Sequence, residues 1–162
     1  MNSKRPIREK RHRLPKECYQ GMIRVNFTGD IKDGLPAFVD DEIYAGMVDC
    51  LRRALKKHRA KNWVYIFMPE HMHCILEGET EETNLLHAMY CFKQQSGLWL
   101  ARHRPAAKWQ KDFYDHIHGK DEDLQKHIGY ILENPVRRKL VDDWRKYPYL
   151  GSLDFRLEDI CW

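Results

Sequence analysis

The strongest constraint on the fold comes from two neighbouring segments, each with the pattern of a β-strand, that are separated by only two residues. Trp63–Met68 is a continuous run of mostly aromatic and β-branched side chains, which is typical of a central strand. Pro69-Glu70 then indicates a turn. His71–Glu77 alternates polar and apolar side chains and ends before Gly78, which indicates another strand. We therefore expect both segments to be strands of an antiparallel sheet.

The rest of the chain adds two strands and three helices to this pair. Period-two alternation predicts strands over Tyr19–Thr28 and Trp109–His118. Apolar residues that recur every three to four positions predict helices over Asp40–Arg59, Glu82–Arg102 and Asp121–Asn134. The order β-α-β-β-α-β-α predicts an α+β fold, in which a ferredoxin-like β-α-β-β-α-β antiparallel sheet carries helices on one face and a C-terminal helix follows. The other face would be free to bind a partner.

Length and composition fit one domain with a hydrophobic core. The chain has 162 residues, of which 43% are hydrophobic. No apolar run approaches the roughly 18 residues that a membrane span needs, and the first residues are charged where a secretory leader would be apolar. The five cysteines are odd in number and form no C-x-x-C pair. We therefore expect a cytoplasmic protein without membrane contact, disulfide framework or zinc ribbon.

Positive charge gathers at the N-terminus. Residues 1–16 contain seven basic side chains and one acidic side chain. We expect residues 1–17 to form a basic arm, residues 18–150 the folded domain, and residues 151–162 a tail of unknown role. A basic arm suits a polyanionic partner, although a solvated tail explains the charge equally well.

Two pairs of histidines have the spacing that places both rings on one face of a strand. His71 and His73 form one pair, and His116 and His118 form the other. Two imidazoles on one face are a natural pair of metal ligands. With nine histidines in the chain, chance pairs of ordinary surface histidines account for this spacing as well.

The last predicted helix carries a tyrosine and an asparagine four residues apart. Tyr130 and Asn134 lie together beside the apolar stripe, and His127 lies one turn before the tyrosine. The stripe itself consists of Leu124, Ile128 and Ile131. A phenol and a carboxamide are thus presented side by side, but a half-buried tyrosine with an Asn helix cap gives the same pattern.

Three motifs in order carry a family resemblance. MPEHMH, WQKDFYDHIH and HIGYILENPVRRKLV together resemble the single-tyrosine HUH transposases, and specifically their branch of REP-associated tyrosine transposases. The resemblance covers residues 17–150. It implies that His71, His73 and Asn134 bind a divalent metal, Mg²⁺ or Mn²⁺, and that Tyr130 is the nucleophile.

The same resemblance implies the reaction and the partner. The substrate would be single-stranded DNA with hairpin (REP-like) structure, cleaved and rejoined through a 5′-phosphotyrosine intermediate. Some relatives act as homodimers that exchange the tyrosine helix, so a monomer and a homodimer are both open. Two neutral imidazoles and a carboxamide would leave the cation's charge available to a phosphate oxygen.

Further residues are candidates for supporting roles. His127 is a possible base or orienting group for Tyr130, and Tyr114 is a second tyrosine close to the expected site. Glu70 is either a carboxylate partner of His71 or a turn residue, and we favour the turn. The candidate DNA contacts lie on the free sheet face and after the last helix: Arg24, Asn26, Arg137, Arg138 and Lys139.

Two other functions fit parts of the pattern. A non-catalytic single-stranded nucleic-acid-binding module or repressor would use the same sheet, with stacking aromatics where HMHCILE offers histidines. A metal-dependent phosphodiesterase would use water and leave Tyr130 structural. A covalent protein–DNA adduct distinguishes the transposase from both.

Overall fold

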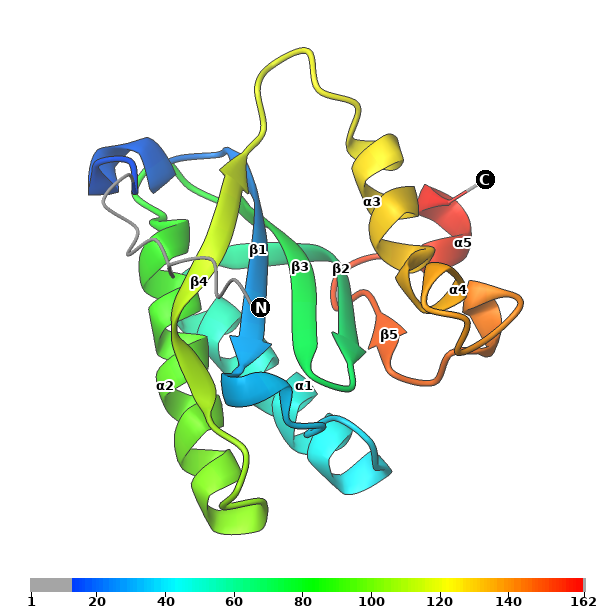
Figure 1. The fold of residues 1–162 in the computed structure, drawn as a ribbon. Helices are drawn as coiled ribbons and strands as arrows, with labels where there is room; N and C mark the ends of the chain where they lie inside the picture. Colours follow the sequence, from blue (N-terminus) through cyan, green and yellow to red (C-terminus); the bar gives the residue numbers. More distant parts are fainter. Residues whose placement is uncertain (1–12, 162) are drawn as a thin grey trace, which may run out of the picture.

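In the computed structural model, which describes residues 13–161, five antiparallel strands form one sheet (Figure 1). The predicted basic arm therefore lies largely outside the described residues. The strand order is β4-β1-β3-β2-β5. The strands are β1 (Arg24–Ile31), β2 (Ala60–Met68), β3 (His71–Gly78), β4 (Trp109–Ile117) and β5 (Leu150–Gly151). The predicted α+β class and the antiparallel sheet are confirmed.

Helices lie on both faces of this sheet. The long helices α1 (Asp41–Lys57) and α2 (Leu85–His103) cover one face, whereas α3 (Leu124–Leu132) lies against the other face beside β2 and β3 (Figure 1). The described chain also contains two short helices, α4 (Asn134–Arg137) and α5 (Leu157–Ile160), and three 3-10 turns. The turns are η1 (Lys16–Tyr19), η2 (Lys32–Gly34) and η3 (Trp144–Lys146).

The larger core lies between the sheet and the two long helices. β1 contributes Val25 and Phe27, and β3 contributes Met72 and Cys74, all with at most 1% of their surface exposed. Burial alternates along β1 and over the first half of β3, so the neighbouring side chains point to the opposite face. This is why the two histidines of β3 share one face of the sheet.

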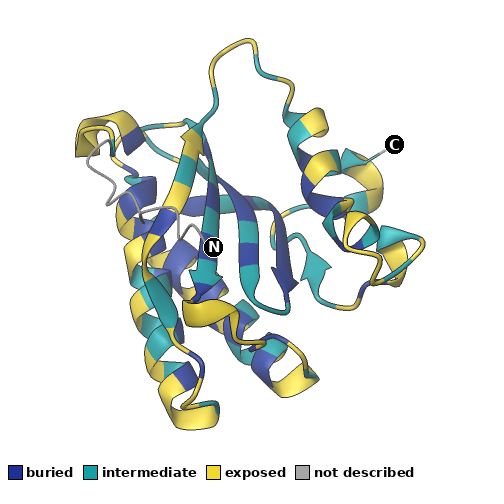
Figure 2. Cartoon of the chain, viewed as in Figure 1, coloured by how far each residue is buried: buried dark blue, intermediate teal, exposed yellow. Residues whose placement is uncertain are grey.

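A second, smaller core lies on that opposite face and corrects the expectation that it is free. Val64 and Ile66 of β2 and Ile75 of β3 pack there against Ile128 and Ile131 of α3. β2 is therefore covered on both faces, which explains its unbroken apolar run (Figure 2). The described residues leave uncovered the part of this face over β1, β4 and the start of β3, and we call this part the open face.

The register orders the side chains of the open face in rows across the sheet. One row runs from Tyr114 through Thr28 to His73, and the next runs from His116 through Asn26 to Ile75. Polar and aromatic side chains thus lie over β4 and β1, and apolar ones lie where α3 packs. The site is placed at the boundary between these two regions.

Two elements begin later than the sequence predicts, one because of a turn and the other because of a helix cap. The first strand begins at Arg24 rather than Tyr19, because Gly21 turns the chain at φ 103° and Tyr19 enters the core, where its hydroxyl donates to Asp115. The last predicted helix begins at Leu124 rather than Asp121, because the Asp123 carboxylate accepts from two backbone N–H groups of the first turn.

The C-terminal end of the same helix is divided in two. α3 ends at Leu132, and Asn134 opens α4 with Pro135 in its first turn, where a proline's missing N–H costs little. Asn134 therefore belongs to the next helix and not to the helix of Tyr130.

The C-terminal tail packs on β2. β5 pairs with β2, and the Phe155 ring stacks on Trp63 with 3.9 Å between ring centroids. The Asp154 carboxylate accepts from the backbone N–H of Asn62 at 2.7 Å. No helix between residues 13 and 161 is long and apolar enough to cross a membrane. All five cysteines carry free thiols.

We predict that one substitution has opposite effects at two helical glycines. A Cβ at Gly129 in α3 would meet nothing within 4 Å, so Gly129→Ala should raise the free energy of unfolding by about 0.5–1 kcal/mol. A Cβ at Gly46 in α1 would lie 2.3 Å from the Trp99 ring of α2, so Gly46→Ala should lower it by about 1–3 kcal/mol. Urea denaturation measures both, and a stabilising Gly46→Ala would contradict this packing.

Candidate active site

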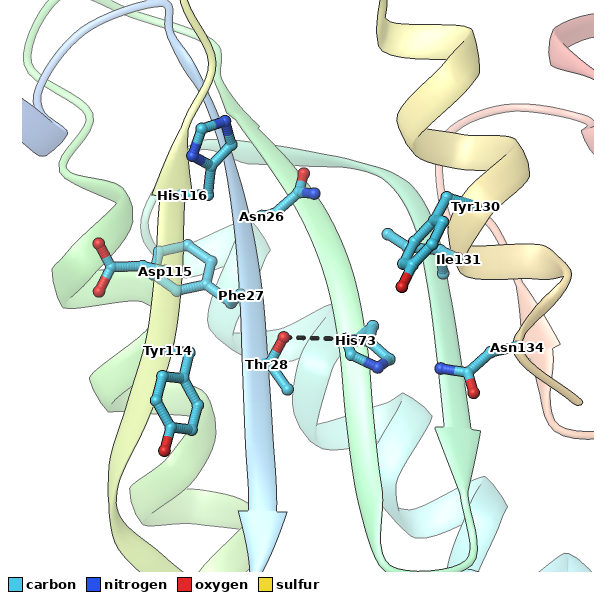
Figure 3. A pocket seen from close by; sticks show the side chains of 10 residues that line it. All are labelled: Asn26, Phe27, Thr28, His73, Tyr114, Asp115, His116, Tyr130, Ile131 and Asn134. Atoms are coloured by element: carbon cyan, nitrogen blue, oxygen red, sulfur yellow. Dashed lines mark hydrogen bonds between the residues drawn. The ribbon is translucent and has the colours of Figure 1, made fainter. Parts of the chain in front are cut away.

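A hollow of about 210 Å³ lies between the open face and α3 (Figure 3). β1, β3, β4, α3 and the start of α4 all contribute to its walls. Its lining residues are Asn26, Phe27, Thr28, His73, Tyr114, Asp115, His116, Tyr130, Ile131 and Asn134. The hollow thus brings together the predicted nucleophile, one predicted histidine ligand and the predicted asparagine ligand.

The histidine pair of β3 lies at the edge of this hollow. The rings of His71 and His73 are 4.8 Å apart between centroids and nearly perpendicular. Nδ1 of His71 lies 3.0 Å from the Glu70 carboxylate, and Nδ1 of His73 lies 2.8 Å from the Thr28 hydroxyl. Both Nδ1 atoms are thus engaged, which leaves each Nε2 for a metal ion or another partner.

Burial keeps His73 neutral. Desolvation, followed by the neighbouring His71 and the guanidinium of Arg137, lowers the pKa of His73 to about 4. Its imidazole is therefore uncharged near neutral pH, and one ring nitrogen keeps a lone pair. Two imidazoles with fixed rings and a nearby carboxamide make a donor set that fits a divalent transition ion.

Tyr130 projects from α3 over the hollow. The residue is 67% exposed, and Figure 3 shows its hydroxyl and the Asn134 carboxamide directed toward β3. Arg137 follows two turns later and contacts this tyrosine twice. Its guanidinium carbon lies 3.9 Å from the centre of the tyrosine ring, and its Nη2 donates to the Tyr130 carbonyl at 2.8 Å. A stacked guanidinium restrains the ring without blocking the hydroxyl.

An ion pair connects the end of α4 with the turn that precedes β3, the strand of His71 and His73. Glu70 lies in the turn between β2 and β3, and its carboxylate accepts from Arg138 as well as from His71. Burial opposes ionisation of Glu70, but the hydrogen bond from Arg138 and the nearby His71 hold its pKa below the usual value. The expectation of a simple turn residue therefore needs correction, since Glu70 is also the carboxylate partner of His71.

The remaining candidate DNA contacts divide between the hollow and its surroundings. Asn26 lines the hollow, and its Oδ1 lies 2.6 Å from Nε2 of His118. Arg24 lies outside it, 3.6 Å from the Glu77 carboxylate and over the Trp63 ring. Lys139 is exposed with φ 57° just after α4. Tyr114, the second tyrosine, lines the hollow from β4 and is 63% exposed.

A second group of possible metal ligands lies at the end of β4. Nε2 of His116 and Nε2 of His127 each lie 2.8 Å from the same oxygen of Glu122. The backbone N–H of Gly119, then His116, lower the pKa of the Glu122 carboxyl to about 2. His127 is absent from the lining of the hollow, and its Nε2 faces Glu122. Sequence reasoning missed Glu122 because it placed this residue in the first turn of the predicted helix, whereas Glu122 lies in the connection before α3.

Comparison with known proteins finds that the chain is similar to transposases in part of its sequence and in its fold. No family model matches it. A Haemophilus influenzae protein, provisionally named a REP-associated tyrosine transposase, is 26% identical over 93 residues, which cover 51% of this chain and 53% of that protein. The Escherichia coli REP-associated tyrosine transposase is 31% identical over 85 residues, which cover 49% and 48%. The chain thus spans about half the length of these curated relatives.

Two solved structures share the fold. The structure of a REP-associated tyrosine transposase bound to a REP hairpin has a TM-score of 0.72 at 20% identity, over 86% of this chain and 80% of that one. A Deinococcus radiodurans protein, provisionally described as a transposase, has a TM-score of 0.53 at 17% identity, over 70% and 90%. These structures show the fold, and the two curated relatives add the likeness in sequence. Together they confirm that this chain resembles the REP-associated tyrosine transposases, the family that its three motifs predict.

Proposed function

We propose that this protein cleaves and rejoins single-stranded DNA near hairpin (REP-like) sequences through a covalent 5′-phosphotyrosine at Tyr130. The observation that carries the proposal is the hollow in which Tyr130, Asn134 and His73 converge. The names of the two relatives and the hairpin in the structure of similar fold support a hairpin DNA partner. The free thiols of all five cysteines support a reducing cytoplasm as its location.

The chemical step begins at the tyrosine hydroxyl. Tyr130 Oη loses its proton and forms a bond to phosphorus, and the bond from phosphorus to the 3′ oxygen breaks, so that the released strand ends in a 3′-OH. Attack by a DNA 3′-OH on the phosphotyrosine later reverses these bonds and rejoins the strand. Arg137 contributes by holding the ring, since it contacts both the ring and the backbone of Tyr130.

The neutral donors of the site suit a metal-assisted reaction. His71, His73 and Asn134 would hold the ion, either Mg²⁺ or Mn²⁺, with Glu70 and Thr28 fixing the two rings. When bound, a divalent cation polarises the phosphate oxygen and stabilises the charge that develops on it. Mn²⁺ tolerates imidazole ligands better than Mg²⁺ does.

The surroundings of the hollow suit an unpaired strand. Asn26 and the exposed ring of Tyr114 form its floor, and such rings stack on bases of any sequence. Arg137 lies beside the hollow on the Tyr130 ring, and the exposed Arg138 and Lys139 follow it in the chain, so all three are candidates to contact phosphates. The tyrosine reaches the hollow of its own chain, and on this ground we propose that a monomer is competent even if a homodimer forms.

Removal of one oxygen tests the nucleophile. Tyr130→Phe keeps the ring against Arg137, so DNA affinity should stay within a few-fold while cleavage and the covalent adduct both vanish. A denaturing gel of the protein with labelled single-stranded hairpin DNA and Mn²⁺ measures both products.

Tyr114→Phe is the matched control, because Tyr114 is equally exposed in the same hollow. It should still form the adduct. An adduct with Tyr130→Phe but not with Tyr114→Phe would assign the nucleophile to Tyr114. Cleavage in both variants without any adduct would indicate water as the nucleophile, and binding without cleavage in the unaltered protein would indicate a non-catalytic module.

The histidine pair predicts a metal requirement. His73→Ala removes a donor from the hollow, so cleavage at fixed Mn²⁺ should fall by more than about 100-fold, since even a partner behind a metal ligand contributes about 10–100-fold. His87→Ala changes an exposed histidine of α2 and should cleave normally. Rates measured over a range of Mn²⁺ concentrations, and in excess chelator, test this. Full activity in the chelator would show that no metal is needed.

The basic arm predicts a salt effect. Deleting residues 1–12 removes five basic and one acidic side chain but keeps Arg13, which pairs with Asp115. Each lost phosphate contact should reduce the slope of log affinity against log salt by about 0.7 on single strands. The rate of cleavage of bound DNA should change little. An identical slope with and without the arm would exclude it as a DNA contact.

A further inference from the structure

We propose that His116, Glu122 and His127 form a second cation site, distinct from the His71–His73 pair and suited to a transition ion such as Zn²⁺. The three side chains come from the end of β4, from the connection after it and from α3. One ligand atom from each lies within 4.8 Å of the other two. This convergence joins three separate parts of the chain at one point.

The positions of the ligand atoms are close to those that a zinc ion requires. Both Nε2 atoms lie 2.8 Å from the same carboxylate oxygen, so the two rings already face a common centre. With bonds of about 2.0–2.1 Å in tetrahedral geometry, zinc ligands lie about 3.3 Å from one another. The two distances from Nε2 to the carboxylate oxygen would therefore lengthen by only about half an ångström, and the two Nε2 atoms already lie within 4.8 Å of each other. The ring protons would then reside on Nδ1, and the Nε2 lone pairs would face the ion.

The donor types also favour a transition ion over Mg²⁺ or Ca²⁺. Two imidazoles and one carboxylate are a donor set that protein-bound zinc uses with water as its fourth ligand. Mg²⁺ and Ca²⁺ prefer sites made of oxygen ligands. The side chain of His116 is 56% exposed and that of Glu122 is 31% exposed, so an ion and its water can enter from solvent. The ionised Glu122 supplies the negative charge that the His71–His73 pair and Asn134 lack.

At this location, a bound ion would have a structural role. His127 lies one turn before Tyr130 on α3, and His116 lines the same hollow from β4. An ion bound here would cross-link β4, the connection and α3. It would thereby hold the first turn of the tyrosine helix against the open face. The metal site itself does not depend on the proposed DNA chemistry.

Zinc binding by the full chain tests the site without DNA. Every protein carries Cys18→Ser, because Cys18 is an exposed thiol that could bind the ion. The metal-free protein is titrated calorimetrically with Zn²⁺, and Co²⁺ serves as a spectroscopic probe of tetrahedral coordination. We expect His116→Ala and His127→Ala each to weaken one Zn²⁺ site by at least about tenfold. The double variant His71→Ala/His73→Ala should retain that site.

A second readout follows the connection itself. Lys120 lies in the connection and Lys126 in the first turn of α3, and both are exposed to trypsin. Zn²⁺ should slow cleavage there several-fold in the parent protein and in His71→Ala/His73→Ala. Glu122→Gln keeps the size of the side chain and should abolish this protection, which distinguishes loss of a ligand from loss of folding.

Three results would overturn the site. The first is Zn²⁺ affinity that His116→Ala and His127→Ala leave unchanged. The second is a protection from trypsin by Zn²⁺ that is lost in His71→Ala/His73→Ala but persists in Glu122→Gln. The third is Zn²⁺ that does not alter cleavage of the parent protein at all. Each would show that the cluster is held by hydrogen bonds alone.

Discussion

The packing of α3 on β2 and β3 is the contact on which the site depends. A helix of nine residues is too short to be stable alone in water. Ile128, Ile131 and Leu132 hold it by burying their side chains against the sheet, each worth about 1.5–3 kcal/mol. Tyr130 lies beside this apolar stripe on the helix surface. The burial that fixes the helix therefore also fixes where the tyrosine enters the hollow.

Polar contacts then set the orientation that apolar packing leaves open. Arg138 reaches Glu70, which in turn meets His71, and Arg137 stacks on Tyr130. Partly exposed ion pairs of this kind add little to the free energy of unfolding. Their effect is directional, because each has a narrow geometry while apolar contact does not. Hydrophobic burial thus holds α3 on the sheet, and the charged contacts orient Tyr130, the proposed nucleophile, relative to His71 and His73 of β3.

Periodicity in the sequence was sufficient for the four longer strands, the three longer helices and the faces of their side chains, but it gave no sign of the short β5. The spacing of His71 and His73 placed both rings on one side of β3, and the spacing of Tyr130 and Asn134 placed both in the hollow although a helix boundary separates them. Periodicity describes one element at a time, however. It does not tell which elements pack together, so the covering of β2 by α3 was not foreseen.

Periodicity also cannot predict the contacts of residues that lie in the connections between helices and strands. Glu122 shows no periodic relation to His116 or His127, yet it meets both. Pro69-Glu70 has the composition of a turn, and nothing local indicates that Arg138 contacts Glu70 across 68 positions of the chain. Such ion pairs depend on how the chain closes in space, which a single sequence specifies only through the whole fold.

Because β1 lies between β3 and β4, its side chains contact histidines on both sides. Thr28 meets His73 on one side, and Asn26, two residues earlier on the same face, meets His118 on the other. Because strand side chains repeat every two residues, two neighbouring polar positions suffice to orient an imidazole from each direction. A hydrogen bond to one ring nitrogen determines which nitrogen remains for chemistry. The middle strand of the open face therefore orients one imidazole on each side, His73 of β3 and His118 just after β4, without contributing a proposed metal ligand itself.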